Sequence, residues 1–161
     1  MKHFNYPFSM ILALLFGMCI LFSCSTVDQA SVDSEIVKII HGTSFGHCRG
    51  YCTKELSFAG SKAIFTKSSV DSTRFPLVSE EIAFSKEEWN KLLEKVDVDS
   101  FFALQERYGC PDCADGGSEY IEIITKNSTK RVTIEYGSSN DELGEFLLLL
   151  RQLRQDKIPT M

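Results

Sequence analysis

Hydrophobic and polar residues alternate along several short segments of the chain, a pattern that predicts β-strands. Four such segments come before the first helix signal: Glu35–His41, Tyr51–Ala59, Ala63–Lys67 and Leu77–Phe84. Gly60 supplies the turn between the second and third segments, which therefore form a hairpin. Two further segments, Tyr120–Lys126 and Lys130–Tyr136, flank a short polar turn and predict a second hairpin.

Other parts of the chain carry the spacing of amphipathic helices. Ser85 and Glu88 form a capping-box pattern, and apolar residues then recur three and four positions apart, which predicts a helix over Lys86–Val96. Asp99–Arg107 predicts a second, short helical turn. Ser139 and Glu142 repeat the capping pattern ahead of a leucine-rich segment, so we expect a last helix that ends near Asp156.

The predicted order of elements is β-β-β-β-α-β-β-α. It lacks the regular strand–helix alternation of a parallel sheet. We therefore expect an α+β fold over residues 35–158, with an antiparallel sheet of about six strands and helices packed on one face. The leucine-rich helix is expected to lie on that sheet, because charged residues bracket its apolar run.

The N-terminus differs in composition from the rest of the chain. Lys2 precedes an uncharged apolar run from Met10 to Phe22, which is shorter than the roughly 20 residues of a membrane-spanning helix. This pattern predicts a signal peptide over residues 1–23. Residues 24–34 are polar and rich in Ser and Asp, and they are expected to form a flexible tether.

The charge of the chain excludes some partners. Its net charge is −5, and removal of Lys2 with a signal peptide would make the charge one unit more negative. A nucleic-acid-binding protein would present a basic stripe instead. The acidic balance equally argues against electrostatic adhesion to anionic lipid, so a membrane location would depend on a covalent lipid.

Four cysteines remain in the expected domain: Cys48, Cys52, Cys110 and Cys113. An even number of thiols in an exported domain is typical of disulfides, and four cysteines allow three connectivities. Two alternatives stay open. The four thiolates, with His47 as a spare ligand, could bind zinc, or the Cys110–Cys113 pair could be a redox centre, although no helix start is predicted there to lower a thiol pKa.

Other motifs give weaker indications. The domain contains His41 and His47, and neither stands in a pattern with the nucleophile and the orienting residue that a catalytic triad needs. Glu119, Glu122 and Glu135 could be paired for glycoside hydrolysis, but Glu122 and Glu135 are expected on the solvent face of their hairpin. The sequence therefore predicts no catalytic residue, no cofactor and no resident metal.

Three short motifs resemble known signals. Leu21-Phe22-Ser23-Cys24 resembles a bacterial lipobox, of the looser kind found in Bacteroidota lipoproteins, which implies that Cys24 becomes the lipid-bearing N-terminus. Ser25 after that cysteine resembles an outer-membrane sorting signal. Asp71-Ser72-Thr73 resembles an acceptor for O-glycosylation at Ser72 or Thr73, and its alternative interpretation is a plain turn.

The segment GHCRGYC is similar to the C-x-G-x-C opening of uncharacterised domains in Bacteroidota lipoproteins. The likeness covers roughly residues 35–105. It implies local pairing of Cys48 with Cys52, and that group has no assigned activity.

Together these features predict a lipid-anchored protein of the cell envelope, in the outer membrane, whose domain lies in the periplasm or at the surface. We expect the disulfide-clipped domain to serve in binding or assembly rather than catalysis. The N-terminal lipid would attach the protein to the membrane. The sequence does not identify a protein or small-molecule partner. The alternative is a thiol-redox or zinc protein that uses the four cysteines.

Overall fold

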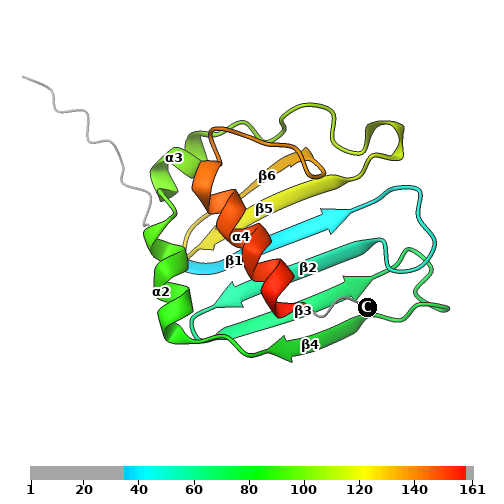
Figure 1. Ribbon diagram of the computed structural model, residues 1–161, viewed down its shortest axis with the longest axis horizontal. Helices are drawn as coiled ribbons and strands as arrows, with labels where there is room; N and C mark the ends of the chain where they lie inside the picture. Colours follow the sequence, from blue (N-terminus) through cyan, green and yellow to red (C-terminus); the bar gives the residue numbers. More distant parts are fainter. Residues whose placement is uncertain (1–34, 159–161) are drawn as a thin grey trace, which may run out of the picture. The chain divides into compact units, whose positions relative to one another are not determined.

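A computed structural model describes residues 35–158 as one antiparallel sheet with helices (Figure 1). The sheet has six strands in the order β4-β3-β2-β1-β5-β6. Their bounds are β1 Ile36–Ser44, β2 Thr53–Ala59, β3 Lys62–Ser68, β4 Val78–Ile82, β5 Ser118–Thr125 and β6 Thr129–Glu135. The α+β fold expected from the sequence is confirmed.

The first strand occupies the centre of the sheet. β1 pairs with β2 on one side and with β5 on the other, and both pairings are antiparallel. On one face, Ile39 lies between Phe58 and Ile123, and these three side chains are fully buried. This face carries the apolar core, as the alternation of the strands requires.

Three α-helices and one short 3-10 turn complete the described chain. The α-helices are α2 Lys86–Glu94, α3 Val98–Ala103 and α4 Gly144–Lys157, and the 3-10 turn η1 is Cys113–Asp115. Figure 1 shows α4 crossing the sheet diagonally, with α2 beside it. Trp89 and Leu92 of α2 join Phe146, Leu147 and Leu150 of α4 in the core.

Two ion pairs hold α2 and α4 antiparallel to each other. Lys95 Nζ at the end of α2 lies 2.7 Å from Glu145 Oε2 in the first turn of α4. Lys157 Nζ in the last turn of α4 lies 2.7 Å from Glu88 Oε1, and this contact lowers the pKa of Glu88. The partly buried Lys157–Glu88 pair fixes the end of α4 over the sheet.

The helix starts reveal one correct and one wrong prediction. Ser85 forms the expected capping box, in which its side chain accepts from Glu88 N–H and Glu88 accepts from Ser85 N–H. The Ser139–Glu142 pattern is not a cap, because α4 begins at Gly144. The Asn140 side chain accepts from Leu143 N–H instead, forming a turn that leads into the helix.

The second helix is shorter than its predicted range. It ends at Ala103 because Leu104 has extended backbone angles, and the Asp97 side chain caps its start by accepting from the Ser100 N–H. Residues 106–108 run beside β6 instead. There the N–H of Tyr108 donates to Thr133 O, and the N–H of Thr133 donates to Glu106 O.

The opposite face of the sheet carries a polar cluster of its own. The Tyr120 ring lies over Gly42, where a Cβ atom would sit 2.1 Å from Tyr120 Cζ. The ring continues across β1, so that its hydroxyl donates to Glu55 Oε1 at 2.5 Å. Arg131 covers the ring, with its guanidinium carbon 4.2 Å from the ring centroid. Only a residue without a side chain at position 42 permits this arrangement.

Candidate functional site

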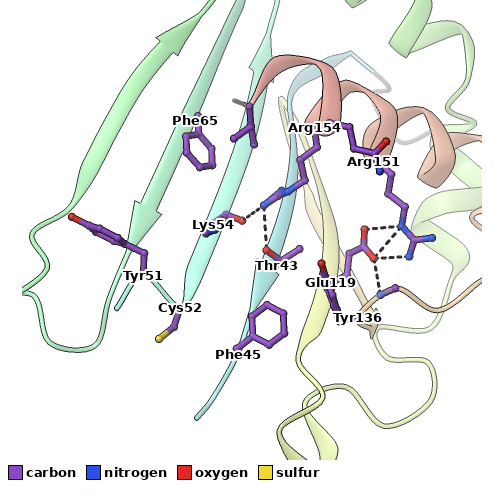
Figure 2. Close-up of a pocket in the computed structure, with 13 residues that line it drawn as sticks. Thr43, Phe45, Tyr51, Cys52, Lys54, Phe65, Glu119, Tyr136, Arg151 and Arg154 are labelled. Atoms are coloured by element: carbon purple, nitrogen blue, oxygen red, sulfur yellow. Dashed lines mark hydrogen bonds and ion pairs between the residues drawn. The ribbon is translucent and has the colours of Figure 1, made fainter. Parts of the chain in front are cut away.

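A cavity of about 710 Å³ lies between the end of α4 and the sheet. Figure 2 shows its residues converging from α4, from β1, β2 and β5, and from the loop after β1. Its lining comprises Thr43, Phe45, Tyr51, Cys52, Lys54, Phe65, Glu119, Tyr136, Gly137, Arg151, Arg154, Gln155 and Ile158. The size falls within the range of small-molecule sites.

Arg154 forms one wall of the cavity. Its guanidinium donates to His41 O at 3.0 Å, to Thr43 Oγ1 at 3.2 Å and to Lys54 O at 2.7 Å. These acceptors belong to β1 and β2, so a single side chain joins α4 to both strands (Figure 2). Burial lowers the pKa of Arg154, and no carboxylate of residues 35–158 pairs with it directly.

Arg151 lies one helical turn earlier and has a different partner. Its Nη2 lies 2.5 Å from Glu119 Oε2 and its Nε lies 3.0 Å from Oε1, so the pair is bidentate. Nη2 also donates to Ser138 O. The hydrogen bond with Glu119 raises the pKa of Arg151. This pair neutralises itself and attaches α4 to β5.

Glu119 is 2% exposed and also accepts a hydrogen bond from His41 Nε2 at 2.6 Å. Burial alone would raise the pKa of Glu119, but the hydrogen bonds from His41 and Arg151 outweigh it and lower that pKa to about 2. Burial also lowers the pKa of His41. The carboxylate is therefore charged, and the imidazole is neutral.

Aromatic rings form the opposite wall. Phe45 and Tyr136 meet edge to face with ring centroids 4.9 Å apart. Tyr51 meets Phe75 in the same way at 5.8 Å, and Lys67 Nζ lies 5.0 Å from the centroid of the Tyr51 ring. Half of the Tyr136 side chain is exposed. The cavity thus combines cationic side chains with ring faces and edges.

The four domain cysteines are disulfide-bonded in local pairs. Cys48 is joined to Cys52, with Cα atoms 5.6 Å apart, and Cys110 to Cys113, with Cα atoms 5.5 Å apart. Cys52 lines the cavity. The first disulfide therefore fixes the loop that carries Phe45 and Tyr51 into the site.

The two disulfide loops lie against each other. Gly46 N–H donates to Asp112 Oδ1 at 3.1 Å, and His47 Nδ1 lies 2.7 Å from Asp115 Oδ1. The Phe45 ring packs against Gly117, where a Cβ atom would lie 2.3 Å from the ring. The Cys110–Cys113 loop supports the aromatic wall from behind.

The Cys110–Cys113 loop has a backbone unlike the start of a regular α-helix. Asp112, Ala114 and Asp115 all have positive φ angles, between 51° and 63°. Asp112 N–H donates to Gly117 O, and Cys110 N–H donates to Glu135 Oε1 at 2.7 Å. Within residues 35–158, no three His, Cys, Asp or Glu side chains converge as metal ligands do.

The remaining predicted positions fall in several places. Cys24 lies outside the described residues. Ser72 and Thr73 are exposed in a turn where Asp71 Oδ1 accepts from Arg74 N–H. Glu122 and Glu135 lie on the sheet face opposite the core, as expected, so neither joins Glu119.

Sequence reasoning missed the charged residues of the cavity. The sequence pattern places Arg151 and Arg154 at the polar boundary of an amphipathic helix, and it places His41 at the end of a strand. One signal could have indicated them: Arg151 and Arg154 are three positions apart and so share a helix face with the apolar Leu147 and Leu150. Cations on that face would need acceptors on the sheet.

No helix among residues 35–158 has the length and apolar composition to cross a membrane. Comparisons with known proteins find no protein-family model and no curated protein that matches this chain.

Proposed function

We propose that this chain is a lipid-anchored protein of the cell envelope whose domain binds a small molecule in the cavity between α4 and the sheet. The single observation that carries the binding function is the lining of that cavity, in which uncompensated cationic groups face aromatic rings. Small-molecule sites combine apolar walls with a few convergent polar groups in this way.

The disulfides support an exported location. Such bonds persist in oxidising compartments and are rare in the cytosol. The lipid anchor itself is supported by the lipobox-like sequence that ends at Cys24. An acidic chain has no electrostatic attraction to anionic lipid, so the anchor would supply the membrane affinity.

The binding domain acts without covalent chemistry in this proposal. The cavity contains Glu119, but His41 and Arg151 already occupy its carboxylate oxygens. With a pKa of about 2, this carboxylate is a poor general base near neutral pH, where effective bases have pKa values close to the working pH. Binding is therefore favoured over acid–base catalysis.

The binding function is tested with a mixture of small fragments of positive, negative and zero charge. Ligand-observed NMR on the domain reports which fragments bind. Gln155→Trp should fill the cavity and abolish binding, because Gln155 lines it and is exposed. Gln152→Trp is the matched control on α4, since Gln152 is exposed outside the cavity. Equal binding by both variants would contradict the proposal.

The anchor is tested separately by fractionation of the expressing cells. Cys24→Ala should release the protein from the membrane fraction, whereas Cys19→Ala, within the apolar run, should leave it there. Retention of the Cys24→Ala protein in the membrane would overturn lipidation at Cys24 without affecting the binding function.

A further inference from the structure

We infer that the cavity binds a small organic monoanion, in which one carboxylate is attached to an aromatic or branched aliphatic body. This inference rests on the proposed ligand-binding function and names the chemical class of the ligand. It follows from the charges of the lining residues, from the end of α4 that they surround, and from the rings that face them.

The charge of the cavity is opposite to that of the chain. The chain carries a net charge of −5, whereas the cavity is lined by Lys54, Arg151 and Arg154 against one carboxylate, Glu119. Arg151 and Glu119 neutralise each other in their bidentate pair. Arg154 and Lys54 remain, so the cavity keeps two uncompensated positive charges.

These two residues have different roles. The Arg154 guanidinium donates hydrogen bonds to His41 O, Thr43 Oγ1 and Lys54 O. Because these bonds hold it in place, it contributes mainly a fixed positive charge to the cavity. The Lys54 side chain is exposed and makes no ion pair with any residue in the range 35–158. Its ammonium is a mobile donor that can move to an incoming carboxylate.

The direction of α4 favours a single negative charge on the ligand. The cavity is lined by residues 151, 154, 155 and 158, so it lies at the C-terminal end of this helix. The C-terminus of a helix carries a partial negative charge of about −0.5. This partial charge offsets part of the two cationic charges in the cavity, so less than two positive charges remain to balance a ligand. The site thus attracts an anion but opposes a second charge on it.

The aromatic residues of the cavity favour a ligand whose uncharged part is apolar. Phe45, Tyr51, Phe65 and Tyr136 line the cavity beside the cations. Tyr136 is half exposed, and its free surface is available to pack against an apolar group. A carboxylate at Lys54 and a ring or branched chain against these residues would occupy both parts of the cavity.

The test compares three probes that share one ring and one linker: phenylpropanoate, phenylpropanamide and phenethylphosphonate. Their affinities are measured by titration calorimetry or NMR at mildly alkaline pH, where the phosphonate is mostly dianionic. The carboxylate should bind most tightly. Lys54→Met should weaken its binding roughly three- to tenfold, leave the amide unchanged and reduce the salt dependence to the part that Arg154 contributes.

The control variant is Lys62→Met, which removes an exposed lysine that does not line the cavity and should change none of the affinities. Equal binding of the amide and the carboxylate would overturn the anion inference while the ligand-binding function stands. Tighter binding of the phosphonate would overturn the preference for a monoanion. If no fragment of any charge binds in the broader mixture, the proposed function itself fails.

Discussion

The imidazole of His41 and the carboxylate of Glu119 are joined by a 2.6 Å hydrogen bond inside the protein, between adjacent strands β1 and β5. His41 Nδ1 has no hydrogen-bond partner among the described residues. A protonated ring would therefore bury an unpaired N–H, which is unfavourable. The neutral tautomer with its proton on Nε2 fits the site, and it donates that proton to the charged Glu119.

This pair makes the fold sensitive to acid. The pKa of Glu119 is lowered from 4.5 to about 2, so its stabilising contribution is present above about pH 4.5 and is lost as the pH falls towards 2. The shift corresponds to roughly 3 kcal/mol. The pKa of His41 is also lowered from 6.5, so its contribution begins to decline below that pH, when the unfolded chain takes up the proton.

We predict that Glu119→Gln lowers the free energy of unfolding at neutral pH and flattens its dependence on pH below 4.5. Urea denaturation at a series of pH values measures both effects. Glu81→Gln, at an exposed position on β4, is the control and should retain the wild-type acid limb. An unchanged acid limb in the Glu119→Gln protein would show that another group governs acid unfolding.

Gly42→Ala tests the contact with Tyr120. Alanine in a strand normally stabilises a protein relative to glycine, by roughly 0.5–1 kcal/mol. Here the added Cβ would lie 2.1 Å from Tyr120 Cζ, so the ring must move and give up its hydrogen bond to Glu55. We expect a loss of about 2 kcal/mol in chemical denaturation.

The same substitution in a Tyr120→Ala background provides the control for that prediction. With the ring absent, Gly42→Ala should be neutral or stabilising, so the sign of its effect should reverse. A similar loss in both backgrounds would mean that the ring is not the obstacle.

Arg154→Met tests the attachment of α4 to the sheet. The substitution leaves His41 O, Thr43 Oγ1 and Lys54 O without their donor, and we expect about 3 kcal/mol of destabilisation. Arg154→Lys keeps the charge but cannot reach three acceptors at once, so it should recover only part of the loss.

The matched control is Gln152→Met on the exposed side of α4, which should stay within about 0.5 kcal/mol of the wild type. Hydrogen exchange of the α4 amides should accelerate in the Arg154→Met protein before the rest of the core is affected. If α4 remains fully protected, its apolar contacts and its other ion pairs hold the helix without Arg154.

Ala114→Gly tests the backbone of the Cys110–Cys113 loop. Ala114 has φ 51° and ψ 37°, a left-handed conformation that an alanine adopts at a cost of about 1 kcal/mol. Glycine removes that cost, so thermal unfolding should show a stability gain of roughly 0.5 kcal/mol. Ala103→Gly in α3 should instead lose stability, by about 0.5–1 kcal/mol. A loss from both substitutions would contradict the proposed strain.

The fold could be predicted from the sequence because each strand and most helices have a recognisable local pattern of residues. Alternation in segments such as Tyr120–Lys126 identified the strands, and the Ser85–Glu88 box located the start of α2 at Lys86. The Ser139–Glu142 prediction failed since the same residue types also occur in turns. There, Asn140 provides the hydrogen bond that a capping serine would have made.

The cavity could not be predicted in the same way, because its chemistry depends on contacts between distant residues. Arg154 acquires its role only when α4 crosses β1 and β2, and Glu119 becomes a buried anion only when Arg151 and His41 meet it. Strand periodicity and residue spacing do not predict the direction in which α4 crosses the sheet. The cysteines form disulfides in the loops beside the cavity, and the charged groups of its lining come from other residues.

The contact between Arg154 and His41 joins residues 113 positions apart. A ribosome synthesises the chain from its N-terminus, so the strands β1 and β2 exist long before the helix that completes the cavity. Until α4 has been made, Thr43 and the carbonyls of His41 and Lys54 lack the donor that covers them. The proposed ligand site is therefore complete only when the last helix of the described chain has docked on β1 and β2.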